Sequence, residues 1–198
     1  MSVHPLRSVP ARRQRADAIR NREAILSAAE RLFAQQAPEE VSMDAIACAA
    51  GVGKPTLYRS FGDRAGLVQA LLETHERALQ EAVLRGPPPL GPGAPPVARM
   101  AAFLEAYVDH IEANLPIMLA ADRARHGVRF GALYEGYRQH ATLLARAARP
   151  GDPLADHLAD ALLAPASPRL YAYQRRRGLT HEQIRTTART VAHRLLEG

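Results

Sequence analysis

Apolar residues recur at spacings of three and four along most of this chain, which is the period of one face of an α-helix. The first such stripe predicts a helix that begins at Asp17 or Asn21. This helix should end near Gln36, because Pro38 disfavours a helical residue before it and cannot extend the backbone ladder. The residues expected to be buried on it are Ile25, Ala28, Ala29, Leu32 and Phe33.

Residues 42–61 read as two short helices with a tight turn between them, at residues 51–53. Ser42 is placed to cap the first helix, because its hydroxyl can accept a hydrogen bond from a free amide two or three residues on. The second helix is apolar at two positions four apart and mostly polar elsewhere. This pattern indicates a helix-turn-helix whose recognition helix is residues 53–61. The positions expected to be buried are Met43, Ile46 and Ala47 in the first helix and Leu57 and Phe61 in the second.

A further apolar stripe predicts a helix that Asp63 caps and that runs to about Arg85. The eleven residues 86–96 then contain six prolines and three glycines, which excludes regular structure there. This stretch indicates a spacer between helices, with a proline-rich ligand for another protein as the alternative. We expect the change from one domain to the next around it. The stripe before it consists of Leu67, Val68, Leu71, Leu72 and Leu79.

Helical patterning resumes after the spacer and continues to the end of the chain. Thr180 and Gln183 form a capping box that opens the last helix. Pro116 is expected to start a short helix of its own. No convincing strand pattern and no internal repeat is present, so the predicted fold class is all-α. The helices expected between the spacer and the capping box are residues 97–114, 116–125, 130–148, 154–162 and 170–177.

Composition fits a packed protein of one or two domains: the chain has 198 residues, of which 47% are hydrophobic. No apolar run approaches the roughly 20 residues that a bilayer-spanning helix needs. The basic N-terminus lacks a following apolar stretch, so a secretory signal is not expected and the cytoplasm is the expected compartment. A single cysteine, Cys48, excludes an intrachain disulfide. Because Cys48 lies among alanines, we expect it to be a small buried residue.

The formal charge of +6 and the isoelectric point near 10.1 favour a polyanionic partner, although a generally basic surface would give the same totals. The distribution is more informative, because residues 1–22 hold six arginines against one aspartate. Residues 1–16 are expected to be a disordered basic arm, which either reaches DNA or remains a solvated tail. The only lysine in the chain is Lys54, inside the predicted recognition helix.

The residues give little indication of an enzyme active site or a metal site. The eight histidines are dispersed, without a pair at metal-ligand spacing beside a cluster of other ligands, so no metal and no cofactor is expected. No nucleophile lies in an evident arrangement with a base, so the protein is not expected to be an enzyme. The alternative function is an all-α small-molecule-binding or enzymatic helical bundle with a basic tail. A third possibility is a nucleoid-type DNA binder without an effector.

Residues 21–72 closely resemble the TetR-type family of transcriptional regulators. The resemblance rests on R-E-A-I-L-S-A-A-E-R-L-F and on A-I-A-C-A-A-G-V-G-K-P-T-L-Y-R-S-F-G-D-R-A-G-L, which is a specific combination at this spacing. It implies an N-terminal three-helix DNA-binding domain, a connecting fourth helix, and a C-terminal helical domain that binds a ligand and dimerises. Most members repress transcription and leave the operator when the ligand binds. The C-terminal half matches only in layout and in its closing Y-x-x-x-R-R-x-G-L segment.

The resemblance implies a DNA-contacting set in and around the recognition helix. Ser42 and Arg64 correspond to phosphate contacts, and the start of the recognition helix corresponds to base contacts, which suits the chemistry of lysine and arginine toward guanine. Two positions depart from the family pattern, because Gly53 replaces a common serine or threonine cap and Ser60 replaces a common larger residue such as histidine. The implied DNA-binding residues are Ser42, Lys54, Pro55, Thr56, Tyr58, Arg59, Ser60 and Arg64.

The C-terminal half would then supply an effector site and a dimer surface. The last helix and residues 154–170 are the expected dimer surface, since two helices from each subunit make a four-helix bundle. Such a homodimer would bind a palindromic operator in double-stranded DNA. The expected domains are 1–16 (arm), 17–66 (DNA-binding), 67–96 (connecting helix and loop) and 97–198 (ligand-binding and dimerisation). Residues that could line a pocket for an unknown small-molecule effector, or could be ordinary core and surface residues, are Met100, Phe103, Tyr107, His110, Met118, Arg123, Tyr134 and Tyr137.

Overall fold

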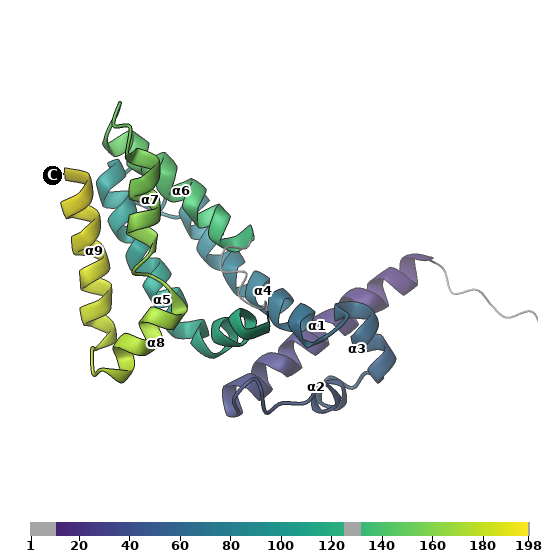
Figure 1. The fold of residues 1–198 in the computed structure, drawn as a ribbon. Coiled ribbons are helices and arrows are strands. Elements are labelled where there is room, and N and C mark those ends of the chain that lie inside the picture. Colours follow the sequence, from purple (N-terminus) through teal and green to yellow (C-terminus); the bar gives the residue numbers. More distant parts are fainter. Residues whose placement is uncertain (1–10, 125–131, 198) are drawn as a thin grey trace, which may run out of the picture. The chain divides into compact units, whose positions relative to one another are not determined.

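The computed structural model describes residues 11–124 and 132–197, and every regular element in those ranges is a helix (Figure 1). The all-α prediction is therefore confirmed. None of the described helices is both long and apolar enough to cross a membrane. The helices are α1 (Ala11–Gln35), α2 (Met43–Ala49), α3 (Lys54–Phe61), α4 (Arg64–Arg85), α5 (Pro96–Ala124), α6 (Ala132–Ala148), α7 (Ala155–Leu163), α8 (Pro168–Arg176) and α9 (His181–Glu197).

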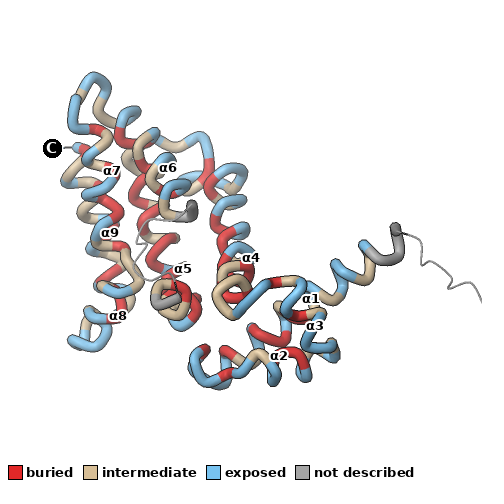
Figure 2. The backbone as a smooth tube through the Cα atoms, turned by 45° about the vertical axis from the view of Figure 1, so that its right-hand side comes forward, coloured by how far each residue is buried: buried red, intermediate tan, exposed pale blue. Residues whose placement is uncertain are grey.

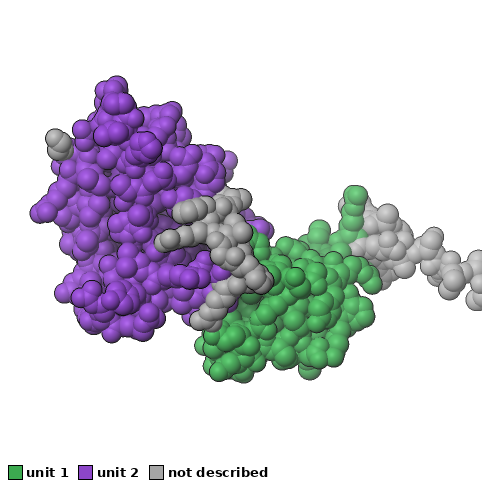
Figure 3. Space-filling model, in the orientation of Figure 1, with its two compact units in different colours: residues 1–71 green, residues 72–198 purple. Residues whose placement is uncertain are grey.

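The chain divides into two compact units, Met1–Leu71 and Leu72–Gly198 (Figure 3). The division falls inside α4, whereas the sequence placed the change of domain at the proline-rich spacer. The first turns of α4 are buried through Leu67 and Leu71. The spacer itself holds no helix before Pro96, as its composition indicates.

The N-terminal unit packs α1, α2 and α3 against one another. The predicted stripes lie inside it, except that Leu32 and Met43 are only half-buried. Ser42 caps α2 as expected, with its hydroxyl accepting a hydrogen bond from the amide of Ala45 at 3.0 Å. The buried residues of this unit include Ile25, Ala28, Ala29, Phe33, Val41, Ile46, Ala47, Leu57 and Phe61.

In the C-terminal unit α5 packs against α6, α8 and α9, and α6 packs against α7. Each of these helices has a buried and an exposed side, which Figure 2 shows as alternating bands. The fully buried side chains of α5 include Met100, Phe103 and Leu104. The predicted capping box opens α9, since the amide of Gln183 donates to Thr180 and the amide of Thr180 donates to Gln183.

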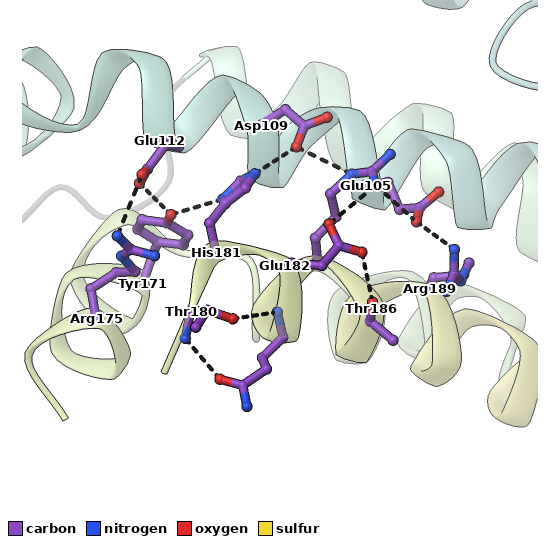
Figure 4. Close-up of polar contacts among 12 residues, drawn as sticks. Glu105, Asp109, Glu112, Tyr171, Arg175, Thr180, His181, Glu182, Thr186 and Arg189 are labelled. Carbon is purple, nitrogen blue, oxygen red and sulfur yellow. Dashed lines mark hydrogen bonds and ion pairs between the residues drawn. The ribbon is translucent and has the colours of Figure 1, made fainter. Parts of the chain in front are cut away.

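A charged seam joins α5 to the two last helices (Figure 4). Arg189 lies 3.1 Å from Glu105, and His181 lies 2.9 Å from Asp109. The hydroxyl of Tyr171, a buried residue of α8, donates to the carboxylate of Glu112. Burial and this carboxylate raise the pKa of Tyr171, so the phenol stays protonated and remains a donor.

Three local predictions are wrong. Helix α1 already begins at Ala11, because the arginine- and alanine-rich residues before Asp17 are good helix formers; residues 1–10 of the expected arm lie outside the described residues. Pro116 does not open a helix but lies inside α5, which changes direction in its second half (Figure 1). Cys48 is exposed, because the short helix α2 turns Ile46 and Ala47 to the core instead.

Candidate functional site

Helices α2 and α3 are joined by a tight turn with the geometry of a helix-turn-helix. Gly51 has a φ of +66°, a conformation that side chains other than glycine rarely adopt. The amide of Val52 donates to the carbonyl of Ala47 at 3.0 Å, which closes the turn. Gly53 is the N-cap of α3 and offers no side chain to the free amides, as the departure from the family pattern implied. Helix α3, the predicted recognition helix, therefore begins at Lys54.

Helix α3 has one packed and one open face, as its sequence predicts. Leu57 is completely buried and Phe61 nearly so. Lys54, Pro55, Tyr58 and Arg59 are exposed, and Thr56 and Ser60 are half-buried. Tyr58 is the large side chain on the open face, with 47% of its surface accessible. The open face thus gathers the residues expected to contact bases and phosphates, and leaves them free of the core.

Several of these side chains already have partners in the protein. The ammonium group of Lys54 lies 2.5 Å from the carboxylate of Asp44 in the first turn of α2. This pairing, chiefly through its hydrogen bond, raises the pKa of Lys54, so the amine is held in its charged form. The hydroxyl of Ser60 donates to the carbonyl of Thr56 at 2.8 Å, and it would have to turn away to meet DNA.

Arg64 lies differently from the phosphate-binding cation that the resemblance implies. Its Nη1 donates to the carbonyl of Val41 at 2.6 Å, and its Nη2 is buried without a hydrogen-bond partner among the described residues. Arg64 therefore ties the start of α4 to the segment just before α2. Its assignment as a phosphate contact stays a prediction.

Arg22 of α1 supports α3, and no sequence pattern predicts this role. Its Nη1 donates to the carbonyl of Ser60 at 3.2 Å, and its guanidinium lies 4.5 Å from the ring centre of Phe61. Both contacts cross more than thirty residues of chain, so no helical spacing could predict them. Arg22 holds the last turn of α3 against α1.

Replacing Arg22 by alanine should lower the free energy of unfolding by about 0.5–1.5 kcal/mol, because a cation–π contact and a hydrogen bond are lost together. Arg31 is the matched control, since it is an exposed arginine on the same helix. Urea denaturation of the two alanine variants checks this. Equal stabilities for the two would show that Arg22 does not support α3.

In the C-terminal unit, part of the predicted effector set forms one aromatic cluster. The ring centres of Tyr107 and Tyr137 are 4.5 Å apart, and those of Phe103 and Tyr137 are 5.8 Å apart. His140 meets Phe103 edge-on at 4.9 Å. Three of the four predicted aromatic residues lie together, and His140, one turn after Tyr137 on α6, joins them. The hydroxyl of Tyr137 and Nε2 of His140 have no hydrogen-bond partner among the described residues.

A chain of polar side chains connects α4 to α5 beside this cluster. Oε1 of Glu76, a residue only 2% exposed, lies 3.1 Å from Nε2 of His110. His110 in turn contacts Asn114 at 3.2 Å, and Asn114 contacts His75. Burial, and then the charge of Glu76, raise the pKa of Tyr107, so its phenol stays neutral. The second oxygen of Glu76 is buried without a hydrogen-bond partner among the described residues.

The other predicted pocket residues are not shown to belong to this cluster. Met100 and Met118 are buried in α5. The hydroxyl of Tyr134 donates to Asp160 of α7 at 3.2 Å instead, and the side chain of Arg123 lies outside the described residues. Sequence reasoning missed Glu76 and Asn114, because polar residues on a helix ordinarily read as its solvent side.

His140 gives the stability a pH dependence. Burial, and then the charge of Arg99, lower its pKa to about 4, against about 6.5 in an unfolded chain. The neutral ring therefore stabilises the fold fully above pH ~6.5, and this contribution is lost as the pH falls toward 4. A fully buried ring would contribute about 3 kcal/mol, and partial exposure reduces this to about 1–2 kcal/mol.

Denaturation of the His140→Gln variant at pH 7 and pH 4 measures that contribution. The loss of stability between the two values should be smaller than in the unaltered protein. His157→Gln is the control, because His157 is exposed on α7. If both variants lose as much stability as the unaltered protein, His140 is not the responsible group.

No group of three or more histidine, cysteine, aspartate or glutamate side chains that could hold a metal ion occurs among the described residues.

The similarity to known proteins is clearest in the N-terminal unit. The family described as "Bacterial regulatory proteins, tetR family" matches residues 25–71. An uncharacterized HTH-type transcriptional regulator of Mycobacterium tuberculosis is 42% identical over 62 residues, and the HTH-type transcriptional repressor BepR of Brucella suis is 38% identical over 61. The matched segments span 31% and 29% of those two proteins and 31% of this chain.

The fold extends the likeness beyond that segment. A TetR-like transcriptional regulator from Rhodococcus superposes with a TM-score of 0.63, covering 90% of this chain and 96% of its own, at 19% identity. The chain therefore matches the tetR family over residues 25–71, and its fold is similar to that of a TetR-like regulator over most of its length.

Proposed function

We propose that this protein is a ligand-responsive, sequence-specific DNA-binding regulator, and that it represses transcription until a small molecule releases it from its operator. One observation carries the proposal: α3 of the helix-turn-helix presents a polar face that is free of the core. Such a helix enters the major groove with its N-terminal residues against base edges. The match to a transcriptional repressor over the same segment supports the direction of regulation.

The DNA contacts divide by chemistry. Lys54, Pro55 and Thr56 open α3 and would meet bases, since an ammonium group can donate to O6 and N7 of guanine. Tyr58 and Arg59 are exposed further along the same face and would contact the backbone or a base edge. Ser42 would hold a phosphate at the start of α2, while Ser60 would contribute only if its hydroxyl leaves the carbonyl of Thr56.

The effector would bind at the aromatic cluster of the C-terminal unit. Rings from α5 and α6 offer stacking surfaces, and the hydroxyl of Tyr137, which has no hydrogen-bond partner among the described residues, offers a hydrogen bond that orients a ligand. Each buried polar atom without a partner costs about 1–3 kcal/mol, so a ligand that satisfies one gains affinity. His110 is connected to the same region by its contact with Glu76.

Two copies of the chain would act together. A homodimer through α9 and residues 154–170 would place two recognition helices against half-sites about one helical turn apart, which requires a palindromic operator. An effector that favours a subunit geometry with a different spacing would release the DNA. A coupling free energy of about 1–3 kcal/mol suffices for such a response.

Binding of the purified protein to its own upstream DNA, measured across a salt series beside random DNA of equal length, tests the proposal. Sequence-specific regulators exceed their non-specific affinity by about 10³-fold or more at physiological salt. If the affinity for upstream DNA never exceeds that for random DNA, the specific regulator is excluded and a nucleoid-type binder is favoured. Release of bound DNA by small molecules is then screened on the same complex.

A further inference from the structure

The ion pair between Lys54 and Asp44 lies where DNA recognition is proposed to occur. Lys54 is the first residue of α3, and Asp44 belongs to the first turn of α2, so the pair bridges the two helices across the turn. Nζ of Lys54 lies 2.5 Å from Oδ2 of Asp44, and the two side chains are 62% and 56% exposed. Both charges are therefore open to solvent, and they neutralise each other at the surface.

A carboxylate at that place opposes binding to DNA in general. Non-specific affinity comes almost entirely from lysines and arginines that neutralise phosphates and release counterions. Lys54 cannot give its full charge to a phosphate while Asp44 holds it. The carboxylate itself would also meet the negative potential of the duplex. The open face of α3 thus carries a built-in cost toward DNA of any sequence.

The edge of a base interacts with this ion pair differently from a phosphate. The O6 and N7 atoms of guanine accept hydrogen bonds from a lysine. The ammonium group has three protons, so it can keep its bond to Asp44 and still donate to the base. An anchored amine also has fewer conformations to lose than a free lysine side chain, which favours a contact in one fixed position.

From these contacts we infer that Asp44 is a specificity-determining residue, which positions the amine of Lys54 for guanine and suppresses binding to non-cognate DNA. This rests on the proposed function, because it assumes that α3 faces the major groove. Asp44 acts through Lys54 and not by its own contact. Its removal should therefore strengthen the binding of random DNA while it weakens discrimination.

The variant Asp44→Asn tests this with the full-length protein and two duplexes, its upstream DNA and random DNA. At 50 mM salt the variant should bind random DNA about 3–10-fold more tightly than the unaltered protein. One additional phosphate contact steepens the salt dependence by about 0.9 in log–log slope, so about threefold of the gain should vanish by 200 mM. The ratio of upstream to random affinity should fall. Glu81→Gln, an exposed carboxylate of α4, is the control for net charge.

A second readout reports the pair without DNA. Because Lys54 is the only lysine, reductive methylation with ¹³C-formaldehyde labels that side chain and the N-terminal amine alone. The ¹³C signal of Lys54 should titrate at lower pH in Asp44→Asn than in the unaltered protein, and Glu81→Gln should leave it unmoved. This separates loss of the ion pair from general damage to the fold.

The outcomes distinguish the two proposals. If the unaltered protein prefers its upstream DNA but Asp44→Asn binds random DNA no more tightly, the inference is overturned and the proposed function stands. If the unaltered protein shows no preference for upstream DNA, the proposed function fails and the inference fails with it. An unmoved Lys54 titration in Asp44→Asn also overturns the inference, since the pair would then not exist in solution.

Discussion

Replacing His110 by leucine should destabilise the C-terminal unit by about 1–3 kcal/mol, because the buried carboxylate of Glu76 loses its hydrogen-bond partner. Glu76 is only 2% exposed, and one of its oxygens already lacks a partner among the described residues. Without His110 its other oxygen loses the 3.1 Å contact as well. Urea denaturation followed by circular dichroism measures the effect.

The double variant Glu76→Leu/His110→Leu gives the decisive comparison. Two leucines of similar volume leave no carboxylate to satisfy, so the pair should be much less destabilised than the sum of the single variants. Glu81→Ala is the control, because Glu81 is an exposed residue of the same helix, and its stability should stay within about 0.5 kcal/mol. Additive losses in the double variant would mean that the two side chains do not depend on each other.

Lys54→Ala should weaken binding to the upstream DNA by about tenfold or more, because a base-contacting cation is removed from the start of α3. Tyr58→Phe should have a smaller effect in the same direction, since it removes only a hydroxyl. Both variants should keep the oligomeric state of the unaltered protein, which size-exclusion chromatography with light scattering checks. Arg85→Ala in the last turn of α4 removes the same charge away from α3 and serves as the control.

Operator affinity equal to that of the unaltered protein in both Lys54→Ala and Tyr58→Phe would show that α3 is not the recognition helix. A loss that is the same for upstream and random DNA would point to a phosphate contact instead of a base contact. A loss confined to upstream DNA supports base recognition. The three results differ, so the role assigned to the start of α3 can be decided from affinities alone.

Local periodicity was sufficient to predict most helices, but it does not predict contacts between residues that are distant in sequence. The stripe from Ile25 to Phe33 repeats every three or four residues, so its helix and its buried side followed directly. Pro116 was misread because a proline ordinarily ends or starts a helix, whereas here α5 continues through it. The all-α fold class could be predicted because it depends only on this local periodicity.

The candidate site likewise has one feature that local spacing predicts and contacts that it does not. The open face of α3 followed from Leu57 and Phe61, whose spacing fixes which side is packed. The partners of that face did not: Asp44 reaches Lys54 across a turn, and Arg22 reaches Ser60 from another helix. Such contacts depend on how helices cross, and a single sequence does not record crossing geometry.

The division of the chain inside α4 has a consequence for protein engineering. The family match ends at residue 71, and the N-terminal compact unit ends at Leu71. A chimera that exchanges DNA-binding cassettes between relatives would therefore be joined in the middle of a continuous helix. Each residue inserted there turns everything downstream by about 100° and advances it by about 1.5 Å, so a working junction has to preserve helical phase as well as sequence.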